Sequence, residues 1–245
     1  MPKKSAPPSE TPAAPITAPP PSEGNTIVMG KGREIPFRNI NTLEIPPDKF
    51  GCSIVMYGAT RSGKTTILNY LYEKLFKDYI SVLMSNSLQA DTYKRLKKSN
   101  ICSDLFHQEI IKYMYHINHE TKNHYKFLVI LDDITDHKFS KEIVKLFSIY
   151  RNSRISTIAN VQATTMMNKT ARANINFVFM GRMNNDLEIE MVIKSYLTSF
   201  FPTGMRMAEK ITMYRQLTDD HHWLIIDQVG NDIFRTKLTP QQVLD

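Results

Sequence analysis

The stretch that most constrains this chain is residues 58–65, which read GATRSGKT. It follows a short apolar segment, 53–57, and opens a segment, 63–76, in which apolar residues return every three or four positions. The spacing of Gly58, Gly63, Lys64 and Thr65 fits the pattern G-x-x-x-x-G-K-[ST]. The pattern predicts a strand, a tight loop and a helix in that order, which is a phosphate-binding loop, or P-loop.

The chemistry of such a loop follows from its glycines and its place before a helix. Glycine lets successive backbone N–H groups turn inward, and with the helix N-terminus they form a cradle for anions. We expect Lys64 to reach the β- and γ-phosphates of ATP and the Thr65 hydroxyl to bind Mg²⁺. The alternative is a glycine turn that only caps a helix. The expected nucleotide-binding residues are Gly58, Ala59, Thr60, Arg61, Ser62, Gly63, Lys64, Thr65 and Thr66.

A second acidic site follows the apolar run 127–131, which ends in Asp132 and Asp133. Five apolar residues predict a buried central strand that holds Asp132 near the magnesium ion, as in a Walker B element. Asp133 would then orient the attacking water. An acid beside the metal ligand favours water as acceptor, and hence an ATPase over a small-molecule kinase. The alternative for the pair is a helix N-cap with its charged neighbour.

The segment 155–161 predicts another strand, which ends at Gln162. Ligands of open α/β sheets bind at the carboxyl ends of the strands, so Gln162 is expected beside the γ-phosphate and the water, unless it only caps the next helix. Arg151 and Arg154 precede this strand, about one strand length (~20 Å) from the P-loop edge. Either is a candidate arginine finger for a neighbouring subunit, or a surface arginine.

Short apolar runs alternate with amphipathic stretches from about residue 26 onward, which predicts an α/β fold with a parallel sheet flanked by helices. Expected strands are 53–57, 80–85, 127–132, 155–161 and 176–181, followed by a closing β-hairpin of 222–227 and 232–238. Expected helices are 63–76, 109–118, 141–150, 186–197 and 205–217.

Residues 1–26 differ in composition, because they hold eight of the 13 prolines of the chain. Such a segment cannot bury enough apolar surface to fold, so we expect a disordered arm before an ATPase domain that spans 27–245. The two cysteines lie 50 positions apart, which excludes a disulfide scaffold. No apolar run approaches the length of a membrane helix, so membrane insertion is not expected.

Taken together, these motifs resemble the packaging ATPases of poxviruses, other large DNA viruses and virophages, within the FtsK–HerA superfamily of DNA-pumping motors. The resemblance covers roughly residues 50–240 and includes a P-loop NTPase fold of the RecA/ASCE-like type. It rests on GATRSGKTT, VILDD, the segment 150–156 before the strand that ends at Gln162, the residues 172–175 and the closing segment 232–238.

The resemblance implies a motor that hydrolyses ATP to move double-stranded DNA into a preformed viral capsid. It implies a homo-oligomeric ring of about five or six subunits, capsid or portal-vertex partners, and a place in the host-cell cytoplasm, a viral factory or the virion. A net charge of +7 fits a polyanionic partner. The alternatives are a nucleoside or nucleotide kinase, a nucleotide-gated switch, or another P-loop ATPase such as a helicase. Candidate channel residues are Lys94, Arg95, Lys97, Lys98, Lys169 and Arg172.

Overall fold

The structure, a computed structural model of the whole chain, describes residues 27–28, 34–45, 49–133 and 141–238. The expected arm 1–26 lies outside the described residues, so the division into arm and ATPase domain stays a prediction. None of the described helices contains an apolar stretch of the length that a lipid bilayer requires.

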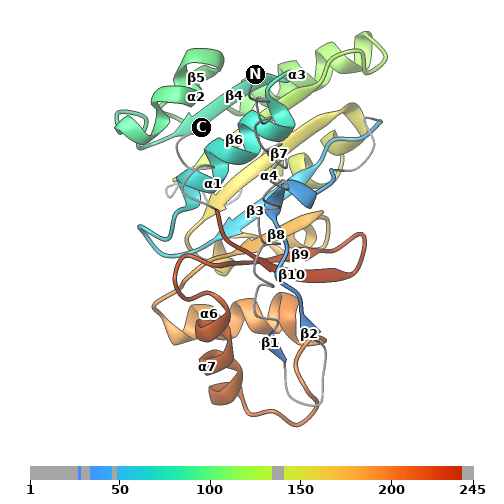
Figure 1. Cartoon of the computed structure of the whole chain (residues 1–245). Coiled ribbons are helices and arrows are strands. Elements are labelled where there is room, and N and C mark those ends of the chain that lie inside the picture. The colour runs from blue at the N-terminus through green and yellow to red at the C-terminus, as the bar shows by residue number, and fades with distance from the viewer. Residues whose placement is uncertain (1–26, 29–33, 46–48, 134–140, 239–245) are drawn as a thin grey trace, which may run out of the picture.

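An eight-stranded sheet forms the centre of the molecule (Figure 1). Its strand order is β10-β9-β8-β3-β7-β6-β4-β5. The six strands from β8 to β5 in this order are parallel, whereas β9 and β10 are antiparallel to their neighbours. The strands are β3 (Ser53–Tyr57), β4 (Ile80–Ser85), β5 (Ile101–Ser103), β6 (Phe127–Asp132), β7 (Ile155–Val161), β8 (Phe177–Met180), β9 (Trp223–Asp227) and β10 (Asp232–Thr236).

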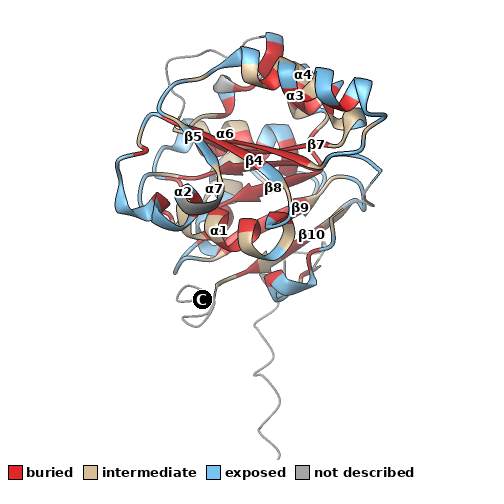
Figure 2. Ribbon diagram, turned by 90° about the horizontal axis from the view of Figure 1, so that it is seen from above, coloured by how far each residue is buried: buried red, intermediate tan, exposed pale blue. Residues whose placement is uncertain are grey.

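Helices cover both faces of the sheet (Figure 2). Residues in β3 alternate between two cores, with Val55 and Tyr57 in one and Ile54 and Met56 in the other. The helical elements are η1 (Ile40–Thr42), α1 (Lys64–Leu71), η2 (Tyr72–Phe76), η3 (Asp91–Tyr93), α2 (Lys94–Ser99), α3 (Gln108–Glu120), α4 (Lys141–Phe147), η4 (Tyr150–Ser153), η5 (Thr164–Met166), α5 (Lys169–Arg172), α6 (Asp186–Val192), η6 (Ile193–Leu197) and α7 (Met207–Leu217).

The α/β fold expected from the sequence is confirmed, including the closing hairpin of β9 and β10. The helices expected at 63–76 and 186–197 are each divided in two. The α-helices α1 and α6 continue into the π-helical turns η2 and η6. The helix expected at 141–150 ends at Phe147 and is followed by the 3₁₀ turn η4. A small antiparallel pair, β1 (Ile27–Val28) and β2 (Glu34–Ile35), was not expected.

Strand order decides where the predicted site lies. The P-loop strand β3 and the Walker B strand β6 are not neighbours, because β7 pairs with both of them. All three strands are parallel, so their carboxyl ends meet at one edge of the sheet. Gln162, which follows β7, therefore lies between the P-loop and the two acids.

Candidate nucleotide site

The loop between β3 and α1 has the geometry of an anion cradle. Gly63 has φ +94°, a left-handed conformation that favours glycine, and the next residue begins α1. The first-turn N–H groups of α1 have no partner within the helix and face whatever anion enters the loop. The Ser62 hydroxyl is also buried without a hydrogen-bond partner among the described residues.

Lys64 spans this cradle. Its Nζ donates to the carbonyl oxygens of Gly58 at 2.7 Å and Ala59 at 2.9 Å. Burial lowers the pKa of the Lys64 ammonium, and the nearby carboxylates of Asp132 and Asp133 oppose that shift. The lysine is therefore tethered within the loop, at the first residue of α1.

Asp132 ends β6 as a buried carboxylate. The hydroxyl of Tyr93 donates to its Oδ2 at 2.6 Å. Burial raises the pKa of Asp132, although the Tyr93 hydroxyl, the adjacent Asn160 amide and Lys64 all oppose that rise. Neither amide atom of Asn160 completes a hydrogen bond of good geometry among the described residues. A hydrated cation would stabilise the buried carboxylate, and its water molecules could bond to the Asn160 amide.

Asp133 adopts a left-handed backbone conformation, with φ 54°. Two donors hold its carboxylate. Gln162 Nε2 donates to Oδ1 at 2.7 Å, and Ser87 Oγ donates to Oδ2 at 2.5 Å. The structure thus brings Asp133 and Gln162 into contact at the sheet edge where each was expected.

A cavity of about 950 Å³ joins these elements. Its wall includes residues that the sequence did not point to, among them Ser87, Tyr93 and Asn160. The only tryptophan of the chain, Trp223 on β9, is buried against the P-loop glycines. Lining residues include Thr60, Arg61, Ser62, Gly63, Lys64, Thr65, Thr66, Ser87, Ala90, Thr92, Tyr93, Asp132, Asp133, Asn160, Gln162, His221, Trp223, Lys237 and Leu238.

Arg151 and Arg154 lie at the opposite end of β7, as expected. Arg154 Nη1 donates to the carbonyl oxygens of Asn123 and His124 at 3.0 and 3.2 Å, whereas Arg151 Nη1 makes one longer bond, 3.3 Å, to Asn174. Arg154 is therefore held more firmly within its own chain than Arg151.

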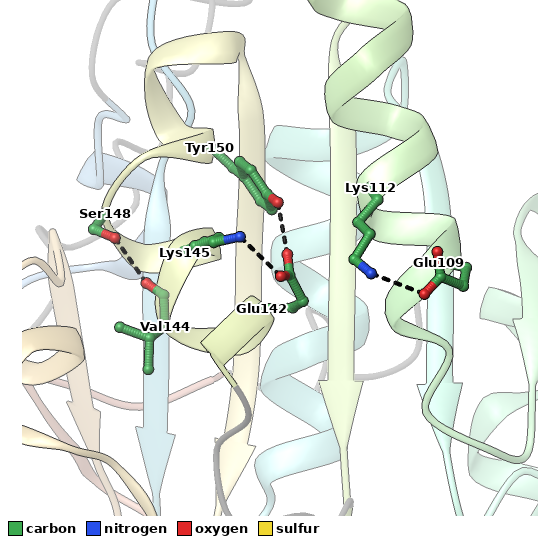
Figure 3. Close-up of polar contacts among 7 residues, drawn as sticks. All are labelled: Glu109, Lys112, Glu142, Val144, Lys145, Ser148 and Tyr150. Carbon is green, nitrogen blue, oxygen red and sulfur yellow. Dashed lines mark hydrogen bonds and ion pairs between the residues drawn. The ribbon is translucent and has the colours of Figure 1, made fainter.

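The turn η4, which carries Arg151, is anchored on α4 by a buried acid (Figure 3). The hydroxyl of Tyr150 donates to Glu142 Oε2 at 2.6 Å, and Lys145 pairs with Oε1 of the same carboxylate at 2.8 Å. This cluster fixes the start of the segment that leads into β7.

The basic candidates fall into two groups on opposite faces of the sheet. Lys94, Arg95 and Lys97 are exposed on α2, whose Leu96 belongs to the core on the α1 side. Lys169 and Arg172 lie on α5, whose Ala171 belongs to the other core. The structure therefore does not bring the two groups together, and nothing is described for the side chain of Lys98.

A family profile described as "Poxvirus A32 protein" matches residues 46–237. The chain belongs to this family. The matched range contains the whole sheet from β3 to β10 and every predicted site residue. Membership in the poxvirus A32 family confirms the resemblance to viral packaging ATPases that the motifs predict. No curated protein matches the chain by sequence.

Solved structures add a likeness of fold to the poxvirus A32 match. The DNA-packaging ATPase B204 of Sulfolobus turreted icosahedral virus has a TM-score of 0.58 at 15% identity, over 78% of this chain and 99% of that one. The B204 protein of Sulfolobus turreted icosahedral virus 2 in complex with AMP gives 0.58 at 14%, over 77% and 98%. The conjugation coupling protein TcpA of pCW3 gives 0.54 at 14%, over 80% and 65%. These matches support the P-loop ATPase fold.

Proposed function

We propose that this chain is a motor that hydrolyses ATP to move double-stranded DNA, and that it packages a viral genome into a preformed capsid. The observation that carries the proposal is the meeting of Lys64, Asp132 and the Asp133–Gln162 pair at one cavity of the sheet edge. Membership in the poxvirus A32 family supports the viral packaging role.

The site residues fit ATP with Mg²⁺. Thr65, at the start of α1, and the buried carboxylate of Asp132 would hold the ion, which would neutralise charge on the phosphates. Asp132 is a hard oxygen ligand, and the Asn160 amide beside it, which completes no hydrogen bond within the described residues, supplies polar capacity for a water shell. The nine loop residues 58–66 would bind the nucleotide.

The roles of the protein groups follow from their present contacts. Lys64 exchanges two neutral carbonyl partners for charged phosphate oxygens, which are stronger acceptors. Asp133 accepts a proton from the attacking water once one of its two donors is released. Gln162 is that donor, because its amide lies between the acids and the P-loop and can turn toward a γ-phosphate.

The assembly we propose is a closed head-to-tail ring of about five or six subunits. Neither Arg151 nor Arg154 can reach the phosphates of its own subunit, since β7 separates them from Gln162. Arg151 is the better finger, because its guanidinium makes a single 3.3 Å hydrogen bond within the described residues. Arg154, with two carbonyl acceptors, is assigned a structural role.

The DNA surface we propose is α2, where Lys94, Arg95 and Lys97 are exposed together on a short helix next to the cavity wall. Such contacts would be made to phosphates and would not depend on base sequence. The chain would act inside the host cell, at the site of virion assembly, with capsid or portal-vertex proteins as further partners.

The test is ATP hydrolysis with and without long duplex DNA. We expect stimulation by duplexes of any sequence, and DNA affinity that falls steeply with salt because bound counterions are released. Lys64→Ala protein provides the matched blank for contaminating ATPases. Hydrolysis that is indifferent to DNA, or binding confined to one duplex sequence, would count against a motor.

A further inference from the structure

The segment that joins β4 to α2 contacts both acids of the site. Ser87 donates to Asp133 Oδ2 at 2.5 Å, and Tyr93 donates to Asp132 Oδ2 at 2.6 Å. The same segment forms part of the cavity wall through Ser87, Ala90, Thr92 and Tyr93. A change at either carboxylate therefore alters a hydrogen bond made by this segment.

The wall leads into the basic helix without an intervening loop. Tyr93 ends the turn η3 and is the residue immediately before α2, and the N–H of Lys94 donates to the carbonyl of Asp91 in that turn. One peptide bond thus separates the tyrosine that touches Asp132 from the first exposed lysine of α2.

Packing leaves this segment little independent freedom. Tyr93 is 3% exposed, and its hydroxyl also accepts a longer bond, 3.3 Å, from Ser85 Oγ at the end of β4. Asn69 on α1 donates to the carbonyl of Thr92 at 3.2 Å, so the P-loop helix holds the other side. Closely packed elements of this kind tend to shift between discrete positions, and small displacements at one end are carried to the other.

We propose that Tyr93 couples occupancy of the nucleotide cavity to the affinity of α2 for DNA. Asp132 Oδ2 now accepts from Tyr93, and an incoming nucleotide with its cation competes for that same carboxylate. When the Tyr93 hydrogen bond is exchanged, the first turn of α2 moves with the tyrosine. This inference rests on the proposed function, because it takes α2 as the DNA surface. Coupling is reciprocal, so DNA on α2 changes nucleotide affinity by the same factor.

The experiment compares dissociation constants for a labelled random-sequence duplex in three states: without nucleotide, with Mg²⁺ and ADP, and with Mg²⁺ and a non-hydrolysable ATP analogue. For the wild-type protein we expect at least two states to differ by about 5-fold or more, the lower range of measured couplings. Tyr93→Phe removes only the hydroxyl and should bring the three constants within about 2-fold of one another.

Tyr150→Phe is the matched control. Tyr150, the first residue of η4, is 4% exposed and donates to the carboxylate of Glu142 on α4 at the same distance, 2.6 Å (Figure 3). Neither residue lines the cavity. This variant should keep the wild-type differences between states. A double variant, Lys94→Ala with Lys97→Ala, should weaken DNA binding in every state. Unchanged affinity in that variant would overturn the assignment of α2.

Hydrogen exchange of the wild-type protein gives a readout that needs no substitution. Amides of residues 91–96 should change their exchange rates when the ATP analogue binds, whereas those of α3 should not. Equal DNA affinities in all states, or full state dependence in Tyr93→Phe, would overturn the coupling and leave a DNA-binding ATPase. Absence of DNA binding in every state would overturn the proposed function, and unchanged exchange at 91–96 would by itself overturn the link from the cavity to α2.

Discussion

Gln162 donates its side-chain amide to Asp133 across 2.7 Å, although the two residues follow different strands, β7 and β6, and lie 29 positions apart in the chain. With Ser87 on the other oxygen, both acceptor atoms of Asp133 are engaged. In the proposed function, Gln162 occupies one oxygen of the proposed base until its amide turns toward a phosphate.

Replacing Gln162 with alanine distinguishes a role in hydrolysis from a role in nucleotide binding. We expect Gln162→Ala to lower turnover by about 10²-fold, the usual cost of losing one positioned donor, while nucleotide affinity stays within about 2-fold of wild type. Trp223 lines the cavity as the only tryptophan, so its fluorescence can report nucleotide binding in each variant. An affinity loss as large as the loss of turnover would contradict the role.

Asp133→Asn keeps the size of the side chain and removes its charge. Turnover should fall by roughly 10² or more, as for other positioned bases, while nucleotide binding stays nearly intact. Asp78→Asn, at an exposed aspartate remote from the cavity lining, is the control for the same chemical change. If binding and turnover of Asp133→Asn fall together, Asp133 is a metal ligand and not the base.

Much of the fold and site could be predicted because both motifs lie where apolar strands end. The run 127–131 marks a buried strand, and the carboxyl ends of parallel strands must meet at one edge. Strand order is different, since it is decided by packing between distant segments. That β7 lies between β3 and β6, and so places Gln162 beside Asp133, could not be read from any local pattern.

The site residues that the sequence did not point to also differ in whether a local pattern could have revealed them. Tyr93 precedes a charged run and has no pattern that links it to Asp132, 39 positions away. Asn160 did leave a signal, because it lies two positions before Gln162 and shares its side of β7 in an otherwise apolar strand end. The strands β1, β2 and β5 are only two or three residues long, too short for period-two alternation to be seen.

Lys64→Ala should abolish turnover and weaken ATP binding. Lys64 lines the cavity, and the carbonyl oxygens of Gly58 and Ala59 hold its ammonium within the loop. Its loss would leave the negative charge of the phosphates uncompensated in the loop. Hydrolysis is measured with phosphate release, and affinity with Trp223 fluorescence. Lys77→Ala, at the exposed residue that follows the π-helical turn η2, should leave both unchanged. Near-normal hydrolysis in Lys64→Ala would refute the assignment of the site.

Arg151→Ala and Arg154→Ala should affect different properties of the protein, turnover in the first and thermal stability in the second. Arg154 binds two carbonyls of the turn before β6, and its Nε is buried, so its loss should mainly lower thermal stability. Within the part of the chain that the structure describes, the Arg151 guanidinium makes one long bond, to Asn174, so its loss should mainly lower turnover, by about 10³-fold if it acts as a finger. A melting temperature and a turnover number for each variant distinguish the two roles.

Mixing decides whether Arg151 acts on a neighbour. Arg151→Ala and Lys64→Ala subunits should each be inactive alone, the first for lack of a finger and the second for lack of a working P-loop. In mixed rings, an interface that pairs the intact P-loop of an Arg151→Ala subunit with the intact arginine of a Lys64→Ala subunit is complete. Part of the activity should therefore return, in proportion to such interfaces. If verified mixed oligomers recover no activity, Arg151 does not act on a neighbouring subunit. Mixing cannot restore activity when the finger and the P-loop must belong to the same subunit.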